Sequence, residues 1–142
     1  MVMNAEKALI EFGLRAIKTI KSNSIAIVRY IHGYTQLLGM GAGQPNRLVA
    51  TQLAIQKSRE NLRNEYTGEE SGFETYVAEE LGKAWLISDA FFPFAVIVEL
   101  AASAGLRKIV QPGGSIRVKA VVQRCNELDV AMVFTGTRHF KH

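Results

Sequence analysis

The sequence Ala84-Trp85-Leu86-Ile87-Ser88-Asp89-Ala90-Phe91-Phe92-Pro93-Phe94 joins a buried strand to an aromatic loop. Its first four residues form a short apolar run, which is typical of a strand inside a sheet. Asp89 stands where this strand ends, and three Phe residues surround Pro93 directly after it. Aromatic rings at a strand end can form a pocket wall that stacks on a flat ring, or they can plug the sheet edge as core residues. The residues alone leave both interpretations open.

Length and composition indicate one globular domain in a reducing compartment. The chain has 142 residues, of which 48% are hydrophobic and 21% charged, enough for one core. Residues 1–20 mix charged side chains into the apolar positions, which is typical neither of a signal peptide nor of a membrane span. Cys125 is the only cysteine, so we expect no disulfide framework and a cytoplasmic location. The single Cys and three His have no zinc-site spacing, so no metal is expected.

The net charge of +4 is distributed unevenly along the chain. Six of the 13 acidic residues lie between positions 65 and 80, where there is no Lys or Arg, and all 17 basic residues lie elsewhere. A basic body attracts anionic ligands such as phosphates, although a solvated basic surface explains the same composition. No aromatic ladder accompanies the basic residues, so small anions are favoured over nucleic acid.

Alternating helix and strand patterns predict an α/β layered sandwich. Apolar residues spaced three or four apart predict helices over 5–20, 48–62, 96–104 and 118–128, with a short one inside 63–83. Short apolar runs predict strands over 25–28, 36–40, 84–87, 107–110 and 130–134, the last one buried inside the sheet. A hairpin turn at 32–34 makes the sheet mixed, with helices flanking it. We expect a single domain over residues 1–142, with an acidic insertion at about 63–83 covering the sheet.

Polar residues at the ends of these elements are candidates for a site. Asn23 lies at a helix-to-strand corner, where its amide can point into a site or cap the turn. Asn46 is a natural N-cap, so Arg47 lies in the first helical turn beside unpaired backbone N–H groups, which favour an anion. The alternative is that Arg47 is a surface residue. The glycine-rich stretch 39–43 allows close approach to a ligand, but Gln44 replaces the third glycine of a dinucleotide fingerprint.

Five motifs, in one order, resemble a known enzyme family. They are Lys-Ser-Asn at 21–23, Gly-Met-Gly-Ala-Gly-Gln-Pro-Asn-Arg at 39–47, Ser-Asp-Ala-Phe-Phe-Pro-Phe at 88–94, Gln-Pro-Gly-Gly-Ser-Ile-Arg at 111–117 and Met-Val-Phe-Thr-Gly-Thr-Arg-His-Phe-Lys-His at 132–142. Together they resemble the C-terminal part of the bifunctional purine-biosynthesis enzymes AICAR formyltransferase/IMP cyclohydrolase, from about Ala5 to the last residue. AICAR is 5-aminoimidazole-4-carboxamide ribonucleotide. The resemblance implies a cytidine-deaminase-like α/β unit and formyl transfer from the co-substrate 10-formyltetrahydrofolate to the 5-amine of AICAR.

The resemblance also implies roles for individual residues. Asn23 matches an Asn that hydrogen-bonds the substrate and helps to orient the reaction, the one catalytic position implied here. Arg47 and Phe91 match substrate-binding positions, with Phe91 against the base. Arg138 matches an Arg that reaches the nucleotide phosphate, and Phe140 lies beside it in the substrate site. Positions that line the folate site match Leu48, Val96, Ser115 and Ile116.

Three departures from the family pattern bear on activity. The family's catalytic pair, a His general base and a Lys that stabilises the oxyanion, belongs to its first formyltransferase unit, and this sequence has no equivalent segment. Val96 stands where the family has an Asp that anchors the pterin. Val118-Lys119-Ala120 replaces the acidic residues usual after Ser-Ile-Arg. We therefore expect a chain that is inactive alone and whose folate binding has to be tested.

Three hypotheses follow for the function of the chain. The first is a separate C-terminal piece of AICAR formyltransferase, as a truncated chain, a split-gene subunit or a diverged relative. It would bind AICAR or a related phosphorylated imidazole ribonucleotide and work as a homodimer or with a partner that carries the N-terminal formyltransferase unit. The second is a non-catalytic nucleotide-binding module. The third is a dimer-assembly module, because the family's sites form at a dimer interface. No nucleic-acid or membrane partner is expected.

Overall fold

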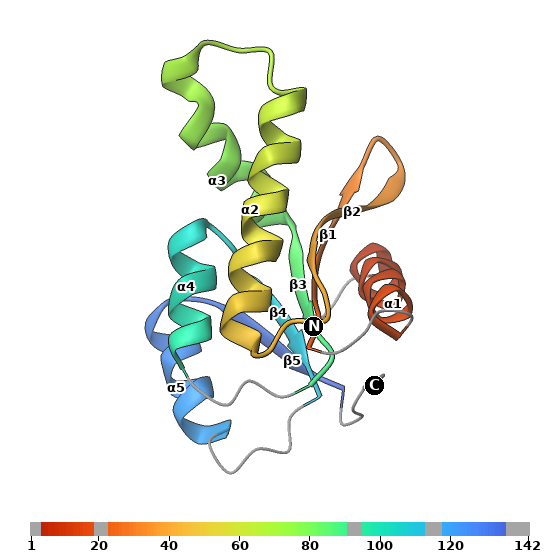
Figure 1. The fold of residues 1–142 in the computed structure, drawn as a ribbon, viewed down its shortest axis with the longest axis vertical. Helices are drawn as coiled ribbons and strands as arrows, with labels where there is room; N and C mark the ends of the chain where they lie inside the picture. The colour runs from red at the N-terminus through yellow and green to blue at the C-terminus, as the bar shows by residue number, and fades with distance from the viewer. Residues whose placement is uncertain (1–3, 19–22, 91–94, 113–117, 136–142) are drawn as a thin grey trace.

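A computed structural model describes residues 4–18, 23–90, 95–112 and 118–135, which form a five-stranded sheet flanked by helices (Figure 1). The elements are α1 (Asn4–Lys18), β1 (Ile25–Ile31), β2 (Tyr34–Gly41), α2 (Arg47–Glu65), the 3-10 turn η1 (Glu70–Gly72), α3 (Phe73–Lys83), β3 (Trp85–Ser88), α4 (Val96–Ala104), β4 (Lys108–Gln111), α5 (Val118–Glu127) and β5 (Ala131–Phe134). Every predicted helix and strand is present, with its ends shifted by a few residues. Within the described ranges, no helix has the length and apolar character needed to cross a membrane.

The sheet is mixed, which confirms the prediction made from the hairpin pattern. The strand order is β2-β1-β3-β4-β5. β1 runs antiparallel to β2 and β3, and β4 and β5 continue parallel to β3. The strands β2, β3, β4 and β5 therefore all end at one edge of the sheet, the lower edge in Figure 1, where β1 begins. Residues that follow these four strands are brought together at this edge.

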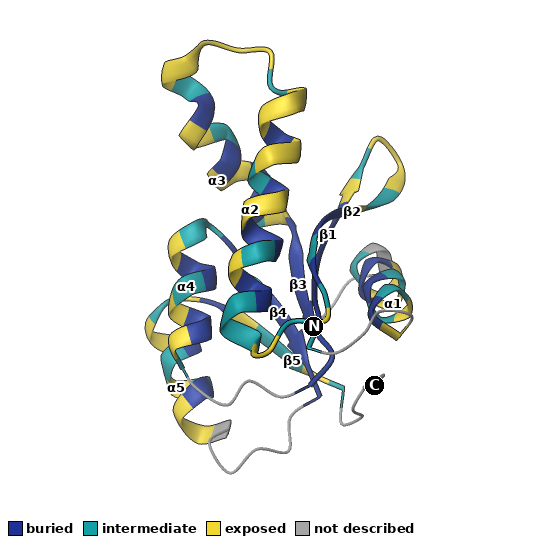
Figure 2. Cartoon of the chain, in the orientation of Figure 1, coloured by how far each residue is buried: buried dark blue, intermediate teal, exposed yellow. Residues whose placement is uncertain are grey.

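Side-chain alternation along the strands divides the core into two layers. Ile25 and Ile27 of β1 pack with α2, α3, α4 and α5, whereas Ala26 and Val28 pack with α1. Successive side chains of a strand point to opposite faces, so one apolar strand can supply both layers. Figure 2 shows buried residues along the central strands β1, β3 and β4 and on the inward sides of the helices. The prediction of a layered α/β sandwich is confirmed.

Two glycines of β2 allow α2 to pack directly on the sheet. A Cβ atom at Gly39 would clash with the carbonyl oxygen of Ala54, and one at Gly41 would clash with the carbonyl oxygen of Ala50. Backbone atoms of a packed helix cannot move aside as a flexible side chain can. The structure thus gives these two residues of the glycine-rich stretch a packing role, where the sequence indicated close approach to a ligand.

β5 is an edge strand, and the prediction that it lies buried inside the sheet was wrong. Among the described strands it pairs with β4 alone, and none of its four residues is buried. Phe134 is 41% exposed. Apolar composition predicts that a strand forms, but the number of neighbouring strands depends on the order of the sheet.

The acidic stretch 63–83 forms the end of α2, η1 and α3, and it contributes to the main core. Three apolar side chains of α3 are buried in the same cluster as the sheet: Phe73, Val77 and Leu81. Two of its acidic residues pair with α2, in the ion pairs Arg59–Glu74 at 2.7 Å and Arg63–Glu70 at 2.5 Å. This pairing neutralises part of the chain's basic excess, which weakens the electrostatic argument for anion attraction.

Candidate functional site

Polar residues from three parts of the chain meet at the edge where β2 to β5 end. Asn23 and Ser24 precede β1, Gln44 lies between β2 and α2, Arg47 begins α2, and Asp89 follows β3. Hydrogen bonds and one ion pair link these residues across the sheet. Ligands of open α/β sheets commonly bind outside the carboxyl ends of the strands, so this edge is the candidate site.

Asn23 is held against the loop that leads into α2. Its backbone N–H donates to the carbonyl oxygen of Gln44 at 3.2 Å, and the N–H of Gln44 donates back at 3.3 Å. The side-chain nitrogen Nδ2 of Asn23 donates to the same carbonyl oxygen at 3.0 Å. This amide orientation engages Nδ2 with Gln44, and it leaves the oxygen Oδ1 to accept a hydrogen bond from a ligand. Asn23 therefore stabilises the helix-to-strand corner through Nδ2 and can also offer Oδ1 as an acceptor. The two interpretations of this residue, a cap of the turn and a contact in a site, are compatible.

Arg47 is paired with a carboxylate buried at the end of β3. Its Nη2 lies 3.5 Å from Oδ1 of Asp89, and the side chains are 14% and 0% exposed respectively. The alternative of an ordinary surface Arg is therefore wrong. The other oxygen of Asp89, Oδ2, accepts a hydrogen bond from the backbone N–H of Ser24 at 3.3 Å. Asp89 was not among the predicted site residues, although a charged residue directly after a buried strand was a signal for it in the sequence.

The first turn of α2 is capped as the sequence predicts. The side-chain oxygen of Asn46 accepts a hydrogen bond from the backbone N–H of Val49 at 2.9 Å, and Asn46 has extended backbone angles. Leu48 is half-buried and packs against the main core. Val96 is the first residue of α4 and is 46% exposed. Both helices begin at the candidate edge in Figure 1, so the structure brings these two positions to the same side of the sheet as Asn23 and Arg47.

The remaining predicted site residues lie outside the described part of the chain: Phe91, Ser115, Ile116, Arg138 and Phe140. The described residues that precede them stand at the candidate edge. Ala90 follows β3, Pro112 follows β4, and Thr135 follows β5. The N–H of Thr135 donates to the carbonyl oxygen of Gln111 at 3.0 Å, which extends the pairing of the two parallel strands to this edge.

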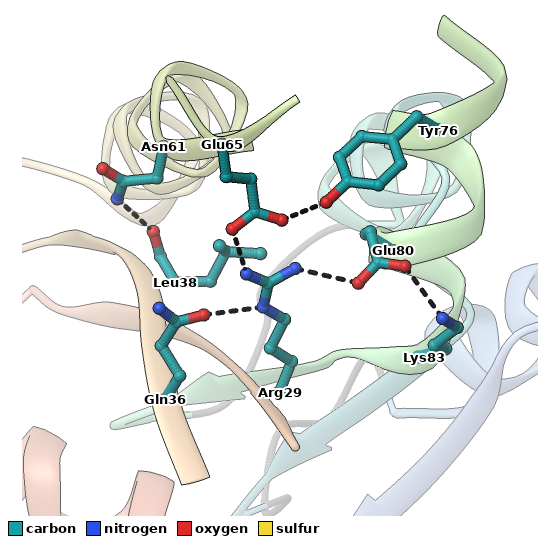
Figure 3. Close-up of polar contacts among 8 residues, drawn as sticks. All are labelled: Arg29, Gln36, Leu38, Asn61, Glu65, Tyr76, Glu80 and Lys83. Carbon is teal, nitrogen blue, oxygen red and sulfur yellow. Dashed lines mark hydrogen bonds and ion pairs between the residues drawn. The ribbon is translucent and has the colours of Figure 1, made fainter. Parts of the chain in front are cut away.

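A polar cavity of about 600 Å³ lies at the opposite edge of the sheet, between the β1–β2 hairpin, α2 and α3. Its centre is the fully buried Arg29, which donates to Gln36 at 2.6 Å, to Glu80 at 2.8 Å and to Glu65 at 2.5 Å (Figure 3). Tyr76 donates a further hydrogen bond to Glu65. Burial by itself would raise the pKa of Glu65, but the hydrogen bonds from Arg29 and Tyr76 and the charge of Arg29 outweigh it and lower that pKa. The charged side chains of this cluster form ion pairs with one another, which is typical of a structural role.

The chain is similar to bifunctional purine biosynthesis enzymes from several bacteria. Over 131 residues, 92% of its length, the chain is 44% identical to the bifunctional purine biosynthesis protein PurH of Acetivibrio thermocellus. It is 39% identical over 138 residues, 97% of its length, to PurH of Enterococcus faecalis. Residues 2–57 match the family model of the AICARFT/IMPCHase bienzyme. The predicted resemblance to this family is confirmed.

The similarity concerns one part of these enzymes. The chain covers 21% of the A. thermocellus PurH and 23% of the E. faecalis PurH, so it spans about a fifth of the length of the curated relatives that it matches. Asn23, Arg47 and Leu48 fall within the residues that match the family model of AICARFT/IMPCHase. The candidate edge therefore contains residues from the portion of the chain that the family model recognises.

Proposed function

We propose that this chain is a C-terminal piece of AICAR formyltransferase that binds AICAR and orients its amine for formyl transfer from 10-formyltetrahydrofolate. The observation that carries the proposal is the edge at which Asn23 is hydrogen-bonded to Gln44 and Arg47 is paired with Asp89, in a chain similar to PurH over at least nine-tenths of its length. The mixed sheet with helices on both faces supports the cytidine-deaminase-like assignment implied by the resemblance.

Asn23 suits a substrate that presents an amine. Its Nδ2 is engaged with the carbonyl oxygen of Gln44, and no described residue donates to its Oδ1. An amide oxygen accepts hydrogen bonds, and an aromatic amine such as the 5-amine of AICAR donates them. We therefore assign to Asn23 the orientation of the attacking amine, and to Arg47 a charged contact with the nucleotide. We assign the base to Phe91 and the phosphate to Arg138 and Phe140 on the resemblance.

Binding and orientation are separate from proton transfer in this proposal. An amide has no basic nitrogen, and a guanidinium stays protonated, so neither Asn23 nor Arg47 serves as a general base at neutral pH. We propose that the base is the His of the Lys–His pair in the family's other formyltransferase unit. That unit would act within a cytoplasmic homodimer or in a partner chain.

A nucleotide-binding module without chemistry is the second candidate, and Val96 favours it. This residue is 46% exposed at the first position of α4, where the family has an acid for the pterin. A valine side chain cannot accept a hydrogen bond, so the folate contact proposed for this position is lost. Under this candidate the chain keeps the AICAR site and no longer binds 10-formyltetrahydrofolate.

Isothermal titration with AICAR and with a folate analogue distinguishes the candidates. The formyltransferase piece binds both ligands, a nucleotide-binding module binds AICAR alone, and a dimer-assembly module binds neither. Asn23→Ala should weaken AICAR binding about tenfold, because it removes one hydrogen bond to the ligand and loosens the corner. The matched control is Asn64→Ala, at an exposed position of α2, which should bind AICAR as the wild type does. Failure of the wild-type chain to bind AICAR would overturn the proposed function.

A further inference from the structure

Asp89 is a buried charge for which the proposed reaction gives no role. Its side chain is fully buried at the end of β3, where an ionised carboxylate is costly unless it is hydrogen-bonded or paired. Two contacts meet this requirement. Oδ2 accepts from the backbone N–H of Ser24 at 3.3 Å, and Oδ1 lies 3.5 Å from Nη2 of Arg47. One carboxylate therefore spans the start of β1 and the start of α2.

The segment Asn23–Ser24 is hydrogen-bonded on one side to Gln44 and on the other to Asp89. Gln44 holds Asn23 through the backbone and through Nδ2, as described above. On the other side, the backbone N–H of Asp89 donates to the carbonyl oxygen of Ser24 at 3.3 Å. This backbone bond does not depend on the side chain at position 89. The carboxylate adds the contact that the backbone cannot supply, a link from this segment to the guanidinium of Arg47.

We propose that Asp89 is a positioning residue, which sets the distance and orientation between Arg47 and Asn23 before the ligand arrives. The identity of the ligand, AICAR, rests on the proposed function, whereas the link between Arg47 and the Asn23–Ser24 segment rests on the contacts of Asp89. An Arg side chain has many rotamers, and fixing one of them in the free protein lowers the ordering cost of binding. Asp89 acts through Arg47 and Ser24 and is not assigned a contact with substrate.

A simple charge effect gives the opposite prediction. The carboxylate lowers the positive potential beside Arg47, so by Coulomb attraction alone its removal would tighten the binding of an anion. Positioning predicts weaker binding instead. The burial of the pair favours positioning, because removing the charge of Asp89 leaves a largely buried guanidinium without this partner, and the side chain is expected to turn away.

A double-mutant cycle of Asp89→Asn and Arg47→Gln tests the proposal. Asparagine keeps the size of the side chain and an oxygen for the N–H of Ser24, but it loses the charge that holds Arg47. In titrations with AICAR we expect Asp89→Asn to weaken binding about tenfold in the wild-type background and less than twofold in the Arg47→Gln background. The control is Asp129→Asn, in an exposed turn with φ of 57°, a conformation that Asn also adopts, and it should not change the affinity.

The outcomes separate this inference from the proposed function. Tighter or unchanged binding by Asp89→Asn, or an equal loss in both backgrounds, overturns positioning. The same cycle in urea without ligand should give non-additive shifts of the unfolding midpoint, and additive shifts overturn the Asp89–Arg47 link. If the wild-type chain does not bind AICAR, the proposed function fails and the ligand-free cycle alone decides the inference. Should Asp89→Asn not fold, NMR of the wild type decides it: the guanidinium of Arg47 should show slow rotation before ligand is added, and free rotation overturns the inference.

Discussion

Val96 allows the folate hypothesis to be tested with one substitution. An acid in the first turn of α4 faces the backbone N–H groups of that turn and the helix dipole, so Val96→Asp should fold and gain about 0.3–1 kcal/mol of stability. If the rest of a folate pocket is intact, the new carboxylate pairs a pterin donor, worth about 1–3 kcal/mol or one to two decades of affinity. We expect Val96→Asp to bind a folate analogue at least tenfold more tightly than the wild type in isothermal titration.

The neutral variant Val96→Asn is the control for that experiment. It offers an oxygen at the same position without the charge, and charge-assisted hydrogen bonds are about twice as strong as neutral ones. Its gain in folate affinity should therefore be smaller than that of Val96→Asp. Unchanged or weaker folate binding by a folded Val96→Asp would show that no folate site remains at this position.

Single residues of the site were predictable where they mark corners of the chain. Asn23 and Arg47 stand at a strand start and a helix start, and local patterns locate such positions well. The link through Asp89 was not predictable in this way. It joins residues 65 and 42 positions apart, and it exists because β3 pairs with β1, a neighbour relation that no local pattern contains.

Among the secondary-structure elements, β1 shows why a strand can extend beyond its apolar run. The sequence predicted a strand that ends at Val28, because a charged residue follows. The strand continues to Ile31, since the charge of Arg29 is met by Glu65 and Glu80, which lie 36 and 51 residues further along the chain. These contacts tie the hairpin to α2 and α3 (Figure 3).

The Arg29 cluster gives stability a defined pH dependence. The pKa of Glu65 is lowered in the folded state, so its interactions stabilise the protein above the pKa of the unfolded chain, near 4.5, and are lost as the pH falls through the lower folded value. Glu65→Gln should cost about 1–3 kcal/mol of unfolding free energy at pH 7. The difference from the wild type should shrink at pH 3. Urea unfolding at the two pH values measures both quantities.

An exposed acid in the same segment provides the control for the pH experiment. Glu69→Gln changes the same chemical group outside the Arg29 cluster, so it should shift the unfolding free energy by no more than about 0.5 kcal/mol at either pH. A cost of Glu65→Gln that stays the same at pH 3 would mean that the ionised carboxylate is not what stabilises the cluster.

Glycine substitutions in β2 and in α3 should have opposite effects on stability. Gly41→Ala places a methyl group against the carbonyl oxygen of Ala50, so the helix must move, and overpacking typically costs about 1–3 kcal/mol. Gly82 lies inside α3, where an added Cβ would have the carbonyl oxygen of Gly105 as its nearest neighbour among the described residues, 3.9 Å away. Gly82→Ala should therefore stabilise the protein by up to about 1 kcal/mol through helix propensity. Thermal unfolding measures both, and stabilisation by Gly41→Ala would contradict the packing role.

At the scale of the whole molecule, the two edges of the sheet at which the strands begin and end hold different groups of charged residues. The edge that holds Arg29 and its acids joins the hairpin to α2 and α3 through internal ion pairs. The other edge collects Asn23, Arg47 and Asp89 where four strands end. Periodicity predicted the layers and the mixed sheet because each face of an element needs apolar cover. Periodicity did not predict that the Arg29 cluster and the Arg47–Asp89 pair would lie at opposite edges of the sheet, since their positions depend on strand order and direction.

The proposed division of roles, with substrate orientation in this chain and proton transfer in another unit, leads to a prediction about activity. A protein of these 142 residues should show no formyl transfer above background, because loss of a general base costs about 10²–10⁴-fold in rate. Adding the family's other formyltransferase unit, with its Lys–His pair, should restore turnover, measured as formation of tetrahydrofolate. In the reconstituted mixture Asn23→Ala should slow the reaction about tenfold or more, whereas Asn64→Ala should not. Robust turnover by the 142-residue protein alone would mean that a base lies within this chain, and that the division between orientation here and proton transfer elsewhere is wrong.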